Sequence, residues 1–392
     1  MTESFDFESV SLDWLRTKPG AKWHRTPDAI AAWVADMDFA PAPVITAALT
    51  RAIATGDLGY PDWRSIIGGS GATDAFVDRC AKRYGWHIDA ADTREFNDVV
   101  QAIQIVLHTC TSPGEGVVVH TPAYPPFLKS LEITGCRLVP VPAQRTEPSS
   151  TGWSYDYDAL DATLRATPAK VLLLCNPQNP TGHVFSDDEL RRITELAERH
   201  ELLIISDEIH ADLTYAPFVH RPMALFAPDR TVSIHAASKA FNLAGMRYAI
   251  AHYGSQSARK AAEALPEHLL GATNLMAAIA VEAAWRDGDQ WLAAVLAHLD
   301  AQRKLLADLL AEYLPQIKYV PPAATYLAWL DCRALDLGDD PSIKFLERGV
   351  RMSEGPNFGS EGIGHARLNF ATSSKVLRDI VTRMVGRETS RS

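Results

Sequence analysis

Short apolar runs alternate with amphipathic stretches through the middle of the chain. Four such runs are Val117–Val119, Val171–Leu174, Leu202–Ile205 and Thr231–Ile234. Between the second and third runs lies SDDELRRITELAERH, in which Ser186 and Glu189 have the spacing of a helix capping box. Leu190, Ile193 and Ala197 add a helical apolar stripe. Because continuous apolar strands alternate with helices, the pattern predicts an α/β fold with a mostly parallel sheet covered by helices.

The last hundred residues have a different character. Ala283–Leu310 is rich in alanine, leucine and charged residues, which predicts long helices, and Tyr326–Leu330 and Ala366–Phe370 are strand-like. We therefore expect a second, smaller α+β domain joined by the N-terminal segment. A length of 392 residues supports two domains. The predicted division is a large domain of residues 47–275 and a small domain of residues 1–46 and 276–392.

Composition narrows the class of protein. Hydrophobic residues make up 47% of the chain and charged residues 22%, with a formal net charge of −10, which disfavours nucleic acid or an acidic membrane as a partner. The five cysteines form no CxxC pair or metal-ligand spacing, which predicts reduced thiols and no metal site. MTESFDFESV does not resemble a signal peptide, and no apolar run approaches the roughly 18 residues of a membrane helix. We therefore expect a cytoplasmic protein.

Polar residues follow three of the apolar runs. Asn176 opens the turn NPQNPTG, Asp207 follows the third run, and Lys239 lies soon after the fourth. In parallel sheets, ligands bind beyond the carboxyl ends of the strands. A lysine, a carboxylate and a polar amide in one site match the needs of pyridoxal phosphate (PLP), which is held by a lysine and by an acid at its ring nitrogen.

Each residue alone has a simpler explanation. A lysine after a strand is usually solvated, an aspartate there is often a helix N-cap, and NPQNPTG could be only a rigid turn. Together, in this order, they indicate a PLP site, in which a partly desolvated Lys239 would form the imine with the cofactor.

The motifs also resemble a known family. NPQNPTG, SDEIH and SKAFNLAGMR, with 28 residues from Asn179 to Asp207 and 32 from Asp207 to Lys239, resemble the class I/II aminotransferase superfamily of PLP fold type I. AWVADMDF, GDLGYP, TPAYPPF, ATYLAWLD and ARLNFA are more narrowly similar to the MalY/PatB-type C–S lyases, often called cystathionine β-lyases. The likeness runs from about residue 20 to about residue 385.

The resemblance implies roles for individual residues. Lys239 would carry the cofactor and move the α-proton, Asp207 would pair with the ring nitrogen, and Tyr124 would stack on the ring. The other cofactor-binding positions would be Asn179 at the ring oxygen and Ser238 beside the lysine. Val99, Val100, Arg247 and, from the neighbouring subunit of a homodimer, Tyr60 would bind the phosphate. Substrate would be bound by Arg367 at its α-carboxylate, with backbone near Ala35 and Asp36 and the side chain of Asn179 close by.

Four positions bear on these assignments. Ala236 and Asp98 stand where relatives often carry a phosphate-binding hydroxyl and a glycine, and a carboxylate beside a phosphate is unfavourable unless it points away. Arg247 is more typical of the aminotransferases than of the lyases. His210 occupies a place where aminotransferases often have tyrosine, and we interpret it as structural or as acting through a neighbour.

The predicted function is a PLP-dependent C–S β-lyase that cleaves cystathionine or a related cysteine S-conjugate to a thiol, pyruvate and ammonia. An aminotransferase is the alternative, because the same residues serve both reactions. A regulatory binding protein on the same fold is a third possibility, since a fold does not determine function. An NAD-dependent dehydrogenase is disfavoured, because no GxGxxG follows the early strands.

Overall fold

The computed structural model describes residues 5–61, 70–146 and 151–386. The strands are β1 (Ile30–Ala31), β2 (Thr93–Phe96), β3 (Gly116–Thr121), β4 (Arg137–Arg145), β5 (Trp153–Tyr155), β6 (Ala169–Cys175), β7 (Leu203–Asp207), β8 (Thr231–His235), β9 (Ala249–Tyr253), β10 (Leu327–Asp331), β11 (Val350–Arg351), β12 (Ser353–Glu354) and β13 (His365–Asn369). The α-helices are α1 (Leu12–Arg16), α2 (Ala21–His24), α3 (Pro43–Thr55), α4 (Gly71–Arg79), α5 (Val99–Cys110), α6 (Pro125–Thr134), α7 (Tyr157–Ala166), α8 (Asp187–Arg199), α9 (Gln256–Glu263), α10 (Glu267–Leu270), α11 (Leu275–Asp287), α12 (Asp289–Tyr313), α13 (Pro341–Glu347) and α14 (Ser374–Met384).

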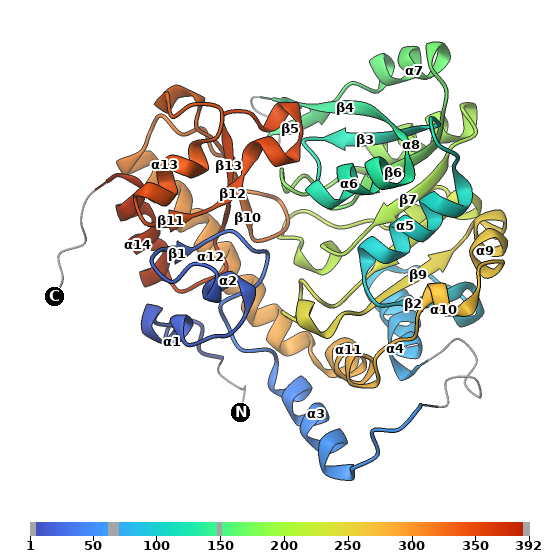
Figure 1. The fold of residues 1–392 in the computed structure, drawn as a ribbon, viewed down its shortest axis with the longest axis horizontal. Helices are drawn as coiled ribbons and strands as arrows, with labels where there is room; N and C mark the ends of the chain where they lie inside the picture. The colour runs from blue at the N-terminus through green and yellow to red at the C-terminus, as the bar shows by residue number, and fades with distance from the viewer. Residues whose placement is uncertain (1–4, 62–69, 147–150, 387–392) are drawn as a thin grey trace.

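A large sheet forms the centre of the molecule (Figure 1). Its strand order is β2-β9-β8-β7-β6-β3-β4-β5. Pairing is parallel from β8 through β7, β6 and β3 to β4, and antiparallel at β9 and β5. The four apolar runs of the sequence correspond to β3, β6, β7 and β8, so the predicted mostly parallel sheet is confirmed.

Both faces of this sheet are covered because each central strand is apolar on both sides. In β3, Val117 and Val119 join a core with α5, α6 and α9, whereas Val118 joins a separate core with α7 and α8. All three valines are buried. This two-sided burial explains the continuous apolar runs, which a sheet with one solvent-facing side would not show.

Helix α8 begins as the sequence predicts. Oγ of Ser186 accepts from the Glu189 N–H at 3.3 Å, and the Glu189 carboxylate accepts from the Ser186 N–H at 2.8 Å. These two bonds satisfy N–H groups that have no partner within the helix. Leu190, Ile193 and Ala197 are buried, as the apolar stripe predicts.

The C-terminal part has its own sheet. Strand β13 lies between β10 and β12, with antiparallel pairing on both sides. The N-terminal segment joins this part through parallel pairing of β1 with β11, where Ile30 lies opposite Val350. Glu8, which precedes α1, also accepts hydrogen bonds from Gln302 of α12 and Ser374 of α14. In Figure 1, α1 and α2 accordingly lie on the side of the molecule that carries α14. The domain division at residues 47 and 275 stays a prediction.

Within the described ranges, no helix is both long and apolar enough to cross a membrane.

Candidate active site

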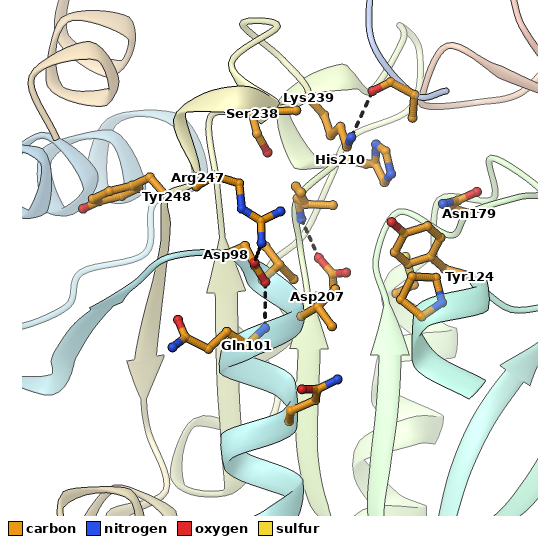
Figure 2. A pocket seen from close by; sticks show the side chains of 18 residues that line it. Asp98, Gln101, Tyr124, Asn179, Asp207, His210, Ser238, Lys239, Arg247 and Tyr248 are labelled. Carbon is orange, nitrogen blue, oxygen red and sulfur yellow. Dashed lines mark hydrogen bonds and ion pairs between the residues drawn. The ribbon is translucent and has the colours of Figure 1, made fainter. Parts of the chain in front are cut away.

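A cavity of about 470 Å³ lies where β6, β7 and β8 end, beside the first turn of α5 (Figure 2). This size falls in the range of small-molecule sites, and the position is the one at which α/β sheets bind ligands. Nine of the predicted site residues line the cavity: Ala35, Val99, Val100, Tyr124, Asn179, Asp207, Ser238, Lys239 and Arg247.

Asp207 is the last residue of β7 and is only 3% exposed. One carboxylate oxygen accepts from the Ile209 N–H at 3.1 Å. Burial raises the pKa of Asp207 to about 7, although the Ile209 bond and the charge of Lys239 act in the opposite direction. A cationic ring nitrogen in the cavity would reverse this shift, because it favours the ionised carboxylate.

Lys239 faces the same cavity from the loop after β8. Its Nζ donates to the carbonyl oxygen of Ala35 at 2.9 Å. Burial lowers the pKa of Lys239, and the charges of Asp36 and Asp207 only partly oppose it. A lysine with a lowered pKa supplies the neutral amine that imine chemistry requires.

Asn179 is fixed by the loop that carries it. The neighbouring Gln178 donates to the Pro122 carbonyl at 2.7 Å and accepts from both the N–H and the hydroxyl of Thr181, at 2.9 and 2.6 Å. Gly182 has φ +69°, and a Cβ there would lie 2.2 Å from a side-chain atom of Pro322. Only glycine fits this turn without strain.

Arg367 reaches this loop from β13 although it is not among the residues that line the cavity. Nη1 donates to Oδ1 of Asn179 at 3.1 Å, and Nη2 donates to the Trp33 carbonyl and to Oγ of Ser353, at 3.2 and 3.0 Å. The guanidinium lies 4.9 Å from the ring centre of Phe358. Burial lowers the pKa of Arg367 to about 10, so it is still charged at neutral pH.

Tyr124 precedes α6, and its ring lies across the cavity from Lys239 in Figure 2. Phe127 packs against the ring edge, with centroids 5.9 Å apart and planes at 78°. Burial raises the pKa of Tyr124, which keeps the phenol neutral. An aromatic face in this position can stack on a planar ligand.

The first turn of α5 forms another wall. Val99 and Val100 stand where backbone N–H groups have no acceptor within the helix, and the helix dipole there favours an anion. Asp98 caps the helix by accepting from the Gln101 N–H at 2.7 Å. Its other oxygen forms a short ion pair with Arg247. The carboxylate that seemed unfavourable in sequence is therefore neutralised by an arginine.

His210, in the loop after β7, is a buried histidine with unused hydrogen-bonding capacity. It is 2% exposed, lines the cavity, and is drawn next to the Lys239 side chain in Figure 2. Within the described part of the chain, its Nδ1 has no hydrogen-bond partner. Burial lowers the pKa of His210 to about 3, so the ring is neutral.

Besides Arg367, two predicted residues, Asp36 and Tyr60, lie outside the cavity lining. The carbonyl of Asp36 accepts from Lys22 at 3.0 Å and from Asn369 at 2.7 Å. The Tyr60 side chain is fully exposed. A role for Tyr60 therefore requires a second subunit.

The sequence interpretation missed several residues at the site. Gln101 and Gln104 line the cavity from α5, Tyr326 donates to the Ala35 carbonyl at 2.7 Å, and Asn369 donates to the carbonyls of Val34 and Asp36. Tyr326 and Asn369 lie within ATYLAWLD and ARLNFA, so the motifs contained the signal. Their partners are backbone carbonyls far away in sequence, which no motif reveals.

The chemical groups around the cavity fit PLP. It brings together a lysine of lowered pKa, a buried carboxylate, an aromatic face and free N–H groups at a helix start. Arg367 also has a buried Nε without a partner among the described residues. Across those residues, no group of three metal-ligating side chains occurs.

Comparisons with known proteins agree with this geometry. The family model described as aminotransferase class I and II matches residues 36–384. Protein MalY of Escherichia coli is 33% identical, covering 88% of this chain and 87% of its own, and cystathionine beta-lyase PatB of Bacillus subtilis is 31% identical, covering 93% and 95%. The PLP-bound C–S lyase of Staphylococcus hominis superposes with a TM-score of 0.89 at 27% identity, covering 97% of this chain and 98% of its own. The predicted resemblance and fold are confirmed.

Proposed function

The chain belongs to the class I and class II aminotransferase family, and from that premise we propose that it is a PLP-dependent C–S β-lyase. The reaction consumes cystathionine, or a related cysteine S-conjugate, and one water molecule, and releases a thiol, pyruvate and ammonia. The observation that carries the proposal is that Lys239 and Asp207 face one cavity of about 470 Å³. The choice of a lyase rests on relatives such as PatB and the S. hominis enzyme, whose names state that activity.

When bound, PLP supplies an electron-withdrawing ring that stabilises negative charge at the substrate α-carbon. In our proposal Lys239 holds the cofactor, Asp207 pairs with its ring nitrogen, Asn179 with its ring oxygen, and Tyr124 covers its face. The lowered pKa of Lys239 and the burial of Asp207 support the first two roles.

Lys239 is also the proposed base. Its Nζ takes the α-proton, and the lowered pKa keeps a larger fraction of the amine neutral at physiological pH. The proton therefore passes from carbon to a nitrogen that is already inside the cavity.

Arg367 is the proposed receptor for the substrate α-carboxylate. A planar guanidinium binds a carboxylate with two parallel hydrogen bonds, which a lysine cannot reproduce. Asn179 and Ser353 hold the guanidinium by its terminal nitrogens. The buried Nε, which has no hydrogen-bond partner among the residues that the structure describes, supports a ligand on that side of the group.

The cofactor phosphate would bind at the N–H groups of Val99 and Val100, with Ser238 and Arg247 nearby. We further propose a homodimer in which Tyr60 of one protomer reaches the phosphate of its partner. Mixing subunits tests this idea: Tyr60→Phe and Lys239→Ala homodimers should both be impaired, and a hybrid of the two should recover one intact site. Without recovery, Tyr60 does not act across an interface.

Incubation with cystathionine in the absence of any keto-acid acceptor tests the reaction type. A lyase forms many equivalents of pyruvate per protomer, whereas an aminotransferase stops after one turnover of the cofactor. Lys239→Ala should form no pyruvate, and substitution of the exposed Lys375 by alanine should leave the rate unchanged. A single equivalent of keto acid from the wild type would contradict the lyase.

We also propose a cytoplasmic location and a division into two domains. The five cysteines are all free thiols, which supports a cytoplasmic location. The pairing of β1 with β11 supports a small domain that contains both ends of the chain.

A further inference from the structure

The carbonyl oxygen of Ala35 accepts two side-chain hydrogen bonds inside the site. Nζ of Lys239 donates to it at 2.9 Å, and the hydroxyl of Tyr326 donates to it at 2.7 Å. Tyr326 is fully buried. A carbonyl oxygen has two lone pairs, so these two donors use its full capacity.

The backbone before Tyr326 is strained. Thr325 has φ +73°, a conformation that is rare for a β-branched residue. Three hydrogen bonds hold it there, because its N–H donates to Leu213, its carbonyl accepts from the Tyr215 hydroxyl at 2.6 Å, and its own hydroxyl accepts from the Leu327 N–H. Such strain persists where the surroundings enforce it, often at functional sites.

The chain around Ala35 is held from several sides. Asn369 donates to the carbonyls of Val34 and Asp36, both at 2.7 Å, so the peptide groups on either side of the one that carries the Ala35 carbonyl are both anchored to β13. Asn242, in the Lys239 loop, accepts from the Met37 N–H at 2.9 Å and donates to the Met37 carbonyl at 3.0 Å. The Ala35 carbonyl therefore has a fixed place relative to both the lysine loop and β13.

We propose that Tyr326 is a positioning residue for Lys239: its hydroxyl occupies one lone pair of the Ala35 carbonyl, so that the released lysine amine binds the other in a single orientation. This inference rests on the proposed role of Lys239 as the base. It adds a reason for the strain at Thr325, which aims the tyrosine at the carbonyl.

The hydroxyl should also favour the neutral amine. A carbonyl that already accepts one hydrogen bond is a weaker acceptor for an ammonium group, so removing the hydroxyl stabilises the protonated lysine. Other ionisable groups that act on Lys239 are Asp36 from the N-terminal segment, Asp207 from β7, His210 from the loop after β7 and Arg367 from β13. These groups are unchanged in a Tyr326→Phe variant.

The first test measures exchange of the substrate α-proton with deuterium oxide by NMR, using Tyr326→Phe holoenzyme. We expect the exchange rate constant to fall roughly tenfold while KM stays within about twofold of the wild type. The acid limb of the pH profile, where the rate constant falls as Lys239 becomes protonated, should move up by roughly half to one pH unit. The matched control is Tyr157→Phe, which removes a buried hydroxyl that lies 3.3 Å from His120, and which should keep the wild-type profile.

The second test does not depend on turnover. An amino acid without an α-hydrogen displaces Lys239 from the cofactor but has no α-proton to lose, so the freed lysine amine persists in the site. Labelling of Lys239 with acetic anhydride against pH, quantified by peptide mass spectrometry, then reports the pKa of its amine. We expect a pKa higher by roughly half to one unit in Tyr326→Phe than in the wild type.

A wild-type exchange profile and lysine pKa in Tyr326→Phe would overturn the inference. A raised KM with an unmoved acid limb would overturn it as well, because that result assigns Tyr326 to substrate binding. If the wild type exchanges the α-proton but forms no pyruvate, the lyase proposal fails and the role of Tyr326 is still measurable.

Discussion

Arg367 donates a hydrogen bond from Nη1 to the side-chain oxygen of Asn179 at 3.1 Å, although 188 residues separate them in the chain. Arg367 lies on β13 of the three-stranded sheet, and Asn179 lies in the loop after β6 of the large sheet. The bond therefore joins the proposed carboxylate receptor to the proposed cofactor ligand. In the proposed site, substrate bound to the arginine would have a defined position relative to the cofactor ring beside Asn179.

Substitution Arg367→Lys should weaken substrate binding. Lysine keeps the charge but not the planar fork, and a lost charge-assisted hydrogen bond costs about 1.5–3 kcal/mol. We expect kcat/KM to fall roughly 10- to 100-fold, mainly through a higher KM, in steady-state assays with cystathionine. Arg351→Lys is the matched control, since Arg351 lies over the Trp33 ring and donates to the Arg25 carbonyl rather than to Asn179. Equal losses in both variants would argue against the assignment.

Substitution Asp207→Asn should impair the reaction while preserving shape. The amide cannot carry the negative charge that a protonated ring nitrogen requires, and removing one preorganised electrostatic partner typically costs a factor of about 10²–10³ in kcat. The absorbance spectrum shows whether the cofactor is still bound. A variant with full occupancy and wild-type kcat would contradict the proposed pairing.

The same substitution should stabilise the cofactor-free protein at high pH. The pKa of Asp207 is about 7 in the fold against 3.8 when unfolded, so the folded state binds the proton more tightly and loses stability as pH rises through that window. Asparagine has no proton to lose. At pH 8, Asp207→Asn should therefore have a free energy of unfolding larger than that of the wild type by on the order of a few kcal/mol, measured by chemical denaturation, and the difference should vanish below about pH 4. A difference independent of pH would show that burial does not shift this carboxyl.

Substitution Asp98→Asn should tighten cofactor binding. Asparagine caps helices as well as aspartate, so α5 keeps its first turn, while a negative charge beside the phosphate is removed and Arg247 is released to the anion. We expect the Kd for PLP to fall several-fold in equilibrium titrations. Asp156→Asn changes the equivalent cap of α7 and is the control. Weaker binding in Asp98→Asn would mean that the ion pair is needed to hold Arg247 in place.

Substitution His120→Phe should reduce the loss of stability in acid. Burial lowers the pKa of His120 to about 3, against 6.5 when unfolded. The contribution of His120 to the free energy of unfolding is therefore fully present above pH 6.5. It declines as pH falls toward 3, because the unfolded state then binds a proton that the folded state does not. The ring packs among Tyr155, Tyr157 and Phe185, so an aromatic replacement suits the site. Chemical denaturation at pH 8 and pH 4.5 should show the variant gaining relative to the wild type at the lower pH; parallel losses would contradict the expectation.

Much of the fold could be predicted because each central strand is apolar on both faces. The run from Val171 to Leu174 shows no alternation of apolar and polar residues. In the structure its successive residues are buried alternately in two different cores. The turn residues after these strands mark the edge where the cavity forms. The residues that follow these strands therefore predicted that Asp207 and Lys239 share one site.

Contacts that depend on tertiary structure could not be predicted. In the sequence, Asp98 is unfavourable beside a phosphate. Its pairing with Arg247, which neutralises it, joins residues 149 apart and could not be predicted. Tyr326 was part of a quoted motif, yet its partner is a backbone carbonyl in the N-terminal segment. Every residue has a backbone carbonyl, so no pattern of side chains could show which carbonyl Tyr326 binds.

Borohydride reduction of the holoenzyme, followed by peptide mapping, tests most directly whether Lys239 carries the cofactor in the cavity it shares with Asp207. Reduction makes the bond between cofactor and amine permanent, so mass spectrometry identifies the lysine. Our account predicts one modified peptide per protomer, with the phosphopyridoxyl group on Lys239 and none in Lys239→Ala. Stoichiometric modification of a different lysine, or of none, would contradict it.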